Sequence, residues 1–393
     1  MSSLIEFEIK KFFNRRKNLL VLAIFIVLSV IFITLNYRLN KQLEKSEITS
    51  IDLQIESMED SLNNLENEII RLPDNEKLKK IKSSYEQELN LLTDIRKAYI
   101  NNDFNKYLES KIQLDKNLLI NIKSGDIISP YDPKEIEQRI EVNTILYEEG
   151  IKPIYTSVSM EGFNFIKLFL NNPISIIIVI LIIVLSGDVV SSEFDSNTYK
   201  LLFTQPISKK RILLSKILTT LIMVNIILFG IIAICFCVLG FINGFGSINY
   251  PVQFYNNGIV KYISIGKFIL FEFILFIILT IFICILAVAI SSFSKSTSNS
   301  ISISIIITVS AYMMSNRGVF SESAHLNPFI YFDISNILQG GIANLYGNEN
   351  VNFKYGILTL GLSIILLVIV NIFLFEKNNI NFNKRIKFIY KTK

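Results

Sequence analysis

The sequence has few of the residues that build metal sites, disulfide frameworks or nucleotide-binding loops. Its 393 residues include one histidine, His325, and three cysteines that all lie inside apolar runs, Cys235, Cys237 and Cys284. A lone histidine cannot form a metal cluster, and these cysteines cannot staple a polar domain, so no metal centre or disulfide framework is expected. No Gly-x-x-x-x-Gly-Lys-Ser/Thr segment is present. The usual phosphate-binding loop for ATP is therefore excluded.

Charged residues are scarce as well. They make up 19% of the chain, against 51% hydrophobic residues, and the mean hydropathy is +0.44. This composition is too apolar for an ordinary soluble enzyme and indicates an integral membrane protein. The net charge is +5, but the basic residues lie beside apolar runs, where Lys and Arg face anionic headgroups. The expected partner is therefore membrane lipid and not nucleic acid.

Six apolar segments are long enough to cross a bilayer as helices. Backbone groups within lipid must form hydrogen bonds inside their own segment, so an all-α membrane protein with six transmembrane helices is predicted. The segments cover residues 19–37, 167–190, 212–242, 263–293, 299–316 and 356–375, and an amphipathic re-entry segment at 161–171 leads into the second of them. Four serines make the fifth segment the most polar: Ser300, Ser302, Ser304 and Ser310. Residues 317–355 are predicted to form an outer or re-entrant loop that closes the top of the bundle.

The flanking charges predict the orientation. Residues 1–18 alternate Phe and Ile with Lys and Arg, which is typical of a helix lying on the membrane surface. Basic residues precede the first span, precede the third span at Lys209, Lys210 and Arg211, and fill the tail at 376–393. By the positive-inside rule these sites are cytoplasmic, so a multi-pass protein of the plasma membrane with both termini in the cytoplasm is expected.

Residues 38–166 are then expected outside the cell. They hold 17 basic and 24 acidic residues, a net charge of −7. Apolar residues at alternating spacings of three and four predict a heptad seam: Ile48, Ile51, Ile55, Met58, Leu62, Leu65, Ile69 and Leu72. A break at 72–76 and a second apolar stripe from Leu78 to Tyr99 predict an antiparallel coiled-coil hairpin. The seam either packs the hairpin or binds a peptide or lipid.

Two further helices are predicted in this outer domain. One covers residues 104–123, and the next begins at Asp132-Pro133, because Asp is a favoured N-cap, Pro suits the first turn and Glu135 completes a capping box. No catalytic residues are visible in the domain.

The most informative stretch is residues 186–216, at the cytoplasmic exit of the second span. The acidic residues Asp188, Glu193 and Asp195 precede a short helix that Pro206 ends, and Ser208 can cap the next helix. This pattern predicts a rigid intracellular elbow at 191–211.

The stretch resembles the signature of type-2 ABC exporter permeases, in which acidic residues are followed by a Gly-Thr, Leu-Leu, Pro-x-Ser-Arg series. The resemblance implies that Asp188 and Glu193 are the elbow's acids, that Thr198, Leu201 and Leu202 form a coupling helix, and that Pro206 and Ser208 end it. Two departures are Asn197 in place of Gly and Lys209 in place of Arg. Asn tolerates a left-handed backbone and Lys keeps the charge.

The resemblance also implies partners. The elbow would contact a separate ABC ATPase subunit, which would carry ATP and Mg, while this chain would bind no cofactor and pair with itself or a sister permease. The expected function is export of an amphipathic substrate such as an antimicrobial peptide or a lipid-linked or cell-wall-related compound. The large outer insertion is a subgroup feature without a fixed function.

Polar residues within the spans suggest a substrate pathway. Glu272 lies about 12 Å into the fourth span, given a rise of 1.5 Å per residue. Ionisable groups there usually face a bundle interior or an aqueous cavity. Glu272 either contacts substrate or has a structural role, as a neutral carboxyl or paired with Lys267. Asn225 is a second pathway candidate, although Asn225 and Asn371 can also hydrogen-bond between helices.

Two other classes of function compete. One is a membrane-anchored surface receptor or secretion-apparatus scaffold that does not transport. The other is an intramembrane enzyme, for which the spans offer only Glu272, Asp188 and the cysteines.

Overall fold

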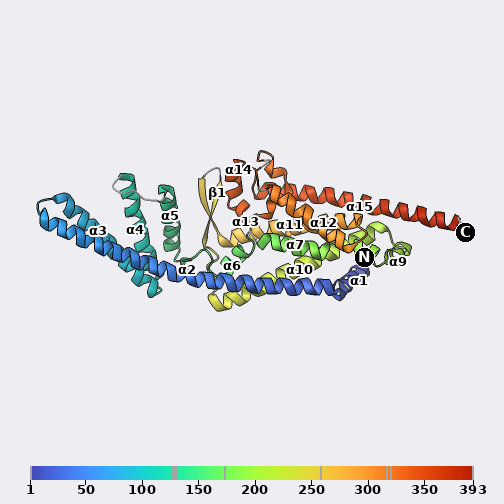
Figure 1. Cartoon of the computed structure of the whole chain (residues 1–393), viewed down its shortest axis with the longest axis horizontal. Helices are drawn as coiled ribbons and strands as arrows, with labels where there is room; N and C mark the ends of the chain where they lie inside the picture. Colours follow the sequence, from blue (N-terminus) through green and yellow to red (C-terminus); the bar gives the residue numbers. More distant parts are fainter. Residues whose placement is uncertain are drawn as a thin grey trace.

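The computed structural model describes residues 2–124, 132–171, 174–256, 259–315, 317–318 and 321–391. It is an elongated, mainly helical molecule in which a helical domain at one end continues into a bundle of long apolar helices (Figure 1). Both chain ends lie toward the opposite end, the N-terminus at the base of the bundle and the C-terminus beyond it. The termini are therefore on the same side of the bundle, far from the helical domain.

The N-terminal segment forms α1 (Ser2–Asn14), as the amphipathic pattern predicts, and the helix is interrupted at Arg15, whose backbone is extended. The amide of Asn18 donates to the Phe12 carbonyl oxygen across this break, at 2.9 Å. The next helix, α2 (Arg16–Arg71), has 56 residues and runs without interruption from the base of the bundle to the tip of the helical domain. The first predicted span and the first helix of the predicted hairpin are therefore one element.

The helical domain consists of the second half of α2 with α3 (Glu76–Ile100), α4 (Phe104–Ser124) and α5 (Pro133–Glu148). Ile51 and Leu62 of the predicted seam are buried, whereas Leu72 is 58% exposed at the turn. Asp132 caps α5, since its carboxylate accepts from the Lys134 amide at 2.9 Å, as the motif predicts. Residues 125–131 lie outside the described part of the chain.

A neck of aromatic residues joins this domain to the bundle. The rings of Tyr99, Tyr107 and Tyr155 pack with centroids 4.6–6.1 Å apart, and Tyr250 contacts the cores of both parts. Burial raises the pKa of Tyr99 to about 12, so its hydroxyl stays neutral at physiological pH. The helical domain is thus packed onto the bundle and not tethered by a loose linker.

The chain enters the bundle through α6 (Gly162–Phe169), which was predicted as a re-entry segment. Phe165, Ile166 and Phe169 are buried, so this short helix packs inside the bundle. It is followed by α7 (Ile174–Ser186), and then by α8 (Ser191–Asp195) and α9 (Tyr199–Thr204) at the base. Residues 172–173 of the second predicted span are outside the described part.

The remaining long helices are α10 (Lys209–Asn243), α11 (Ile265–Phe293), α12 (Thr297–Ser315) and α15 (Phe353–Lys391). Helix α11 is the central one, since 61% of its apolar window is buried, against 22–28% for the other candidate spans. In the described residues five helices are long and apolar enough to cross a membrane: α2, α10, α11, α12 and α15. Helix α7 is apolar but shorter.

The structure departs from the expected layout in three places. Two antiparallel strands that were not predicted, β1 (Pro251–Asn256) and β2 (Ile259–Ser264), pair as a hairpin. The predicted loop at 317–355 contains the short helices η1 (Ala324–Leu326), η2 (Pro328–Phe332), α13 (Ile334–Leu338) and α14 (Gly341–Tyr346). The backbone of α15 continues as helix to Lys391, past the predicted end of the sixth span, and the side chains of the tail at 376–393 lie outside the described part.

Candidate functional site

The stretch predicted as an elbow does form a compact turn at the base of the bundle. The chain leaves α7 at Ser186, forms α8, turns at Asn197 and continues as α9. Asn197 has a φ of +58°, the left-handed conformation that Asn tolerates better than most residues. Asn197 can therefore stand where the resemblance expects Gly.

Glu193 of α8 is buried among cations. Its carboxylate lies 2.6 Å from the ammonium of Lys216 on α10 and is also paired with Lys11 of α1. Lys216 itself is 1% exposed and reaches Glu8 of α1 at 2.7 Å. The Thr198 hydroxyl donates to the second oxygen of Glu193. These contacts join α1, the elbow and α10 through buried ion pairs.

The environment of Glu193 favours its charged form. Burial alone would raise the pKa of this carboxyl, but the charge of Lys216 and the hydrogen bonds from Lys11, Lys216 and Thr198 outweigh it and lower the pKa to about 2. Glu193 is therefore ionised at physiological pH and held by its partners.

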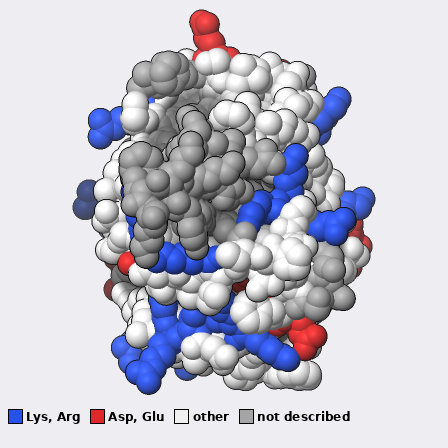
Figure 2. All heavy atoms as spheres, turned by 90° about the vertical axis from the view of Figure 1, so that its right-hand side faces the viewer, with Lys and Arg blue, Asp and Glu red and all other residues white. Residues whose placement is uncertain are grey.

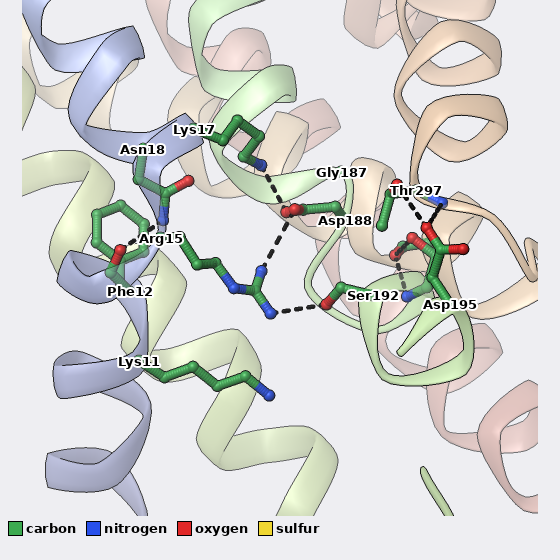
Figure 3. A network of polar contacts seen from close by, with 12 residues as sticks. Lys11, Phe12, Arg15, Lys17, Asn18, Gly187, Asp188, Ser192, Asp195 and Thr297 are labelled. Atoms are coloured by element: carbon green, nitrogen blue, oxygen red, sulfur yellow. Dashed lines mark hydrogen bonds and ion pairs between the residues drawn. The ribbon is translucent and has the colours of Figure 1, made fainter. Parts of the chain in front are cut away.

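Asp188, at the start of the elbow, makes a second set of ion pairs. Figure 3 shows the Asp188 carboxylate between Arg15, at 3.3 Å, and Lys17, at 2.7 Å. Arg15 also donates to the Ser192 hydroxyl at 2.7 Å. Arg15 and Lys17 flank the point where α1 meets α2, so this junction is fixed to the elbow.

Helices α11 and α12 hold the elbow from the other side. The Ser291 hydroxyl of α11 accepts from the amides of Val190 and Ser191, at 3.2 and 2.9 Å, and so satisfies donors at the start of α8. The Asp195 carboxylate accepts from the Thr297 hydroxyl at 2.8 Å (Figure 3). Ser300 donates to the Gly187 carbonyl oxygen. The elbow thus contacts α1, the start of α2, α10, α11 and α12.

The predicted coupling residues therefore divide into two groups. Asp188 and Glu193 face inward, 5% and 3% exposed. Leu201 is 70% exposed, Leu202 is half-buried, and Thr198, Pro206 and Ser208 lie at the surface. Lys and Arg side chains gather on this end of the molecule (Figure 2). The two buried acids hold the elbow against the bundle, and the exposed side chains of α9 form the outer surface of the elbow.

Glu272 lies in the interior of the bundle, away from the elbow. Its side chain is fully buried, and within the described residues neither carboxylate oxygen has a hydrogen bond of normal geometry. The groups that act on it are the Ser335 hydroxyl of α13 and the Lys167 ammonium of α6. Lys267, which was one of the alternatives considered as a structural partner of Glu272, is exposed. The cation whose charge acts on Glu272 belongs to α6.

The asparagines of the spans form contacts between helices. The side-chain oxygen of Asn225, Oδ1, accepts from the Thr280 hydroxyl at 3.0 Å, which links α10 to α11. Asn371 of α15 donates to the Ile285 carbonyl oxygen of α11 at 3.2 Å. Both contacts are typical of helix packing in membranes.

Sequence reasoning missed the elbow's partners. The positive-inside rule already accounts for the cations Lys11, Arg15 and Lys17, so no contacts were expected for them. Ser291 lies in an apolar run that indicates no particular contact. The one available signal was the match between a basic N-terminal segment and two acids at the base. Across the described residues, no cluster of three or more His, Cys, Asp or Glu side chains is placed to hold a metal ion.

A comparison with known protein families finds that residues 3–380, nearly the whole chain, match the family described as ABC-2 family transporter protein. The match includes the elbow, the long apolar helices and the inserted helical domain. A search of curated proteins finds no match. The chain belongs to the ABC-2 transporter family and is a membrane transport subunit of an ABC transporter.

Proposed function

We propose that the chain is the permease of an ATP-driven exporter and that the outer surface of its elbow docks on a separate ABC ATPase subunit. One observation carries the proposal. The elbow is fixed from within by Asp188 and Glu193 and still exposes Leu201, so a push on α9 would pass directly into α1, α10, α11 and α12.

The proposed topology has six spans. Helix α7, with the residues before it, would cross the membrane as the second span beside the five longer helices. Both termini and the elbow would lie in the cytoplasm, because basic residues flank α1 and the start of α10. The helical domain formed by the second half of α2 with α3, α4 and α5 would then lie outside the cell, and the protein would lie in the plasma membrane of a bacterium.

We also propose that two permease chains, identical or sister, pair with two ATPase subunits and move an amphipathic substrate outward. ATP and Mg would be bound by the ATPase. Glu272 is fully buried and the charge of Lys167 on α6 acts on it, so Glu272 would respond if α6 moves, whereas Asn225 would act mainly in packing.

The proposal is tested by purifying the tagged full-length chain from its native host in mild detergent and identifying copurifying proteins by mass spectrometry. A stoichiometric ATPase with a phosphate-binding loop is the expected result. Its reproducible absence would contradict the exporter proposal and favour a receptor or secretion scaffold, because the helical domain and bundle would then lack a motor.

A further inference from the structure

A cavity of about 560 Å³ lies at the end of the bundle opposite the elbow. Its walls come from β1, β2, α13, α14 and the first residues of α11 and α15, which Figure 1 places between the helical domain and the spans. The volume is within the range of small-molecule sites in proteins, about 300–1,000 Å³. None of the predicted coupling or pathway residues lines this cavity.

The floor of the cavity is apolar and rich in aromatic rings. Phe268 and Ile337 are buried beneath it, and Phe254, Phe271 and Phe353 form its sides. The rings of Phe271 and Phe353 lie 4.7 Å apart at an angle of 32°. Aromatic walls of this kind bind apolar side chains or rings and gain from their specific ring packing.

A close backbone approach shapes one wall. The Tyr255 amide donates to the Gln339 carbonyl oxygen at 2.8 Å. The next residue, Gly340, has a φ of +76°, and a Cβ atom there would lie 2.6 Å from the Tyr255 carbonyl oxygen. Only glycine fits this contact, which fastens β1 to the α13–α14 connection. The wall is therefore part of the folded structure before any ligand binds.

The rim of the cavity is polar. Asn344, Glu349, Asn350 and Lys354 line it and are exposed, while the Asn352 side chain caps α15 by accepting from the Tyr355 amide at 3.2 Å. A polar rim above an apolar floor favours entry from water or the headgroup region over entry from the hydrocarbon core.

The composition of this rim discriminates between ligands. Glu349 and Lys354 are its charged residues, one of each sign, so the rim offers no cluster of cations for a phosphate headgroup. Asn344 and Asn350 carry amides, which donate and accept at once. The matching partner is a backbone that also presents donors and acceptors together, as every peptide does.

We propose that this cavity binds an amphipathic peptide, with an apolar side chain on the aromatic floor and the peptide backbone on the asparagine rim. The proposal deepens the proposed function, on which it rests, by naming a peptide as the substrate class and placing its outer binding site. The site lies next to α13, whose Ser335 faces Glu272 while Ile337 and Leu338 line the cavity.

The absence of tryptophan from the chain makes a direct test available. Phe254→Trp introduces a single tryptophan reporter into the wall, and Phe353→Trp provides a second one if the first destabilises the protein. The detergent-purified full-length reporter is titrated with a short capped peptide carrying central aromatic and aliphatic side chains. A matched peptide with serine at those positions and nanodiscs containing phosphatidylglycerol form the other arms.

The expected result is a saturable blue shift with the apolar peptide alone. Ala343→Leu, which fills the cavity, should abolish the shift, whereas Ala311→Leu, on α12 outside the cavity, should leave it unchanged. Asn350→Ala should weaken binding roughly two- to tenfold, as expected for one hydrogen bond to the ligand.

Three outcomes would overturn the proposal. The first is that neither reporter shows a saturable shift, and the second is a shift that survives Ala343→Leu. The third is a shift caused by phosphatidylglycerol but not by peptide, which would make the site a lipid site. The ATPase copurification experiment is independent of all three. Failed peptide binding beside a copurifying ATPase would reject the substrate site alone, and the reverse result would reject the exporter while keeping the site.

Discussion

The ammonium of Lys216 and the carboxylate of Glu193 lie 2.6 Å apart, and both are buried at the base of the bundle. Because Lys216 also contacts Glu8, at 2.7 Å, this one cation joins α10 to both α8 and α1. Buried ion pairs are costly to break, since removing one partner leaves an uncompensated charge away from water.

Lys216→Met should therefore destabilise the protein by roughly 3–5 kcal/mol. The measurement is thermal unfolding in detergent followed by circular dichroism. Lys295→Met, at an exposed position just after the end of α11, should change stability by less than about 0.5 kcal/mol. Adding Glu193→Gln to Lys216→Met should recover part of the loss. Unfolding of Lys216→Met at the wild-type temperature would contradict the proposed role of the pair.

The low pKa of Glu193 predicts acid sensitivity. The pKa is about 2 in the folded protein and has an ordinary value of 4.5, so folding favours the ionised form. The stabilisation is complete above about pH 4.5 and is lost as the pH falls toward 2. Unfolding temperatures measured across this range should fall more steeply for the wild type than for Glu193→Gln. Parallel curves for the two proteins would show that Glu193 does not cause the loss.

Leu201→Asp should remove the ATPase from the purified complex without lowering the unfolding temperature. Leu201 is 70% exposed on α9, so the carboxylate disturbs a docking surface and not the core. Leu345→Asp is a matched control, because Leu345 is 73% exposed on α14 at the other end of the bundle. Retention of a stoichiometric ATPase by Leu201→Asp would place the docking surface elsewhere.

Glu272 and Lys167 should behave as a coupled pair. Lys167→Leu removes the ammonium whose charge acts on the fully buried Glu272, and it should lower the unfolding temperature measured in detergent. The double variant Lys167→Leu/Glu272→Leu should be more stable than Lys167→Leu alone, because the buried acid that has lost its cation is then removed as well. Lys267→Leu, at an exposed position, is the control. Additive effects of the two single changes would argue against the pairing.

Two glycines separate backbone strain from steric contact. Both Gly340 and Gly347 have a left-handed backbone, with φ values of +76° and +60°. A Cβ atom at Gly340 would contact the Tyr255 carbonyl oxygen, whereas a Cβ atom at Gly347 would have no neighbour within 4 Å. Gly347→Ala should therefore cost roughly 1 kcal/mol, the price of a left-handed alanine. Gly340→Ala should cost at least twice that, measured by thermal unfolding. Equal costs would show that the wall relaxes around a methyl group.

The features that follow from local patterns were predictable from the sequence. The heptad seam from Ile48 to Ile69 lies on the side of α2 that faces its neighbours, because apolar spacing alone defines that face. The Asp132 cap and the left-handed Asn197 also depend on one residue and its immediate neighbours. Each of these features involves a short stretch of chain.

Features that depend on distant residues were not predictable. The pairs of Lys11 with Glu193 and Arg15 with Asp188 join segments more than 170 residues apart, and no local pattern selects one cation over another. Lys167 was likewise not distinguishable from Lys267 as the partner of Glu272. The continuity of α2 was missed because the sequence becomes polar after Leu35, which predicts the end of a membrane span. Polar residues are as compatible with a helix as apolar ones, so this change does not predict the end of the helix.

The hairpin of β1 and β2 was missed despite a signal. The strands contain the β-branched residues Val252, Ile259, Val260 and Ile263, and the two residues between them in the sequence are Asn257 and Gly258, a pair typical of a tight turn. In a chain dominated by long apolar helices these short strands were left unassigned. They form part of the wall of the cavity proposed to bind peptide.

The uninterrupted α2 connects the elbow directly to the far end of the molecule. Its first turn is held by the ion pairs of Arg15 and Lys17 with Asp188, and its other end forms the tip of the helical domain. With 56 residues at a rise of about 1.5 Å each, the helix is about 84 Å long, so a tilt of about 5° at the base would displace the tip by about 7 Å. A small rotation at the elbow would therefore be magnified, at the opposite end of the molecule, into a displacement comparable to the width of a side chain.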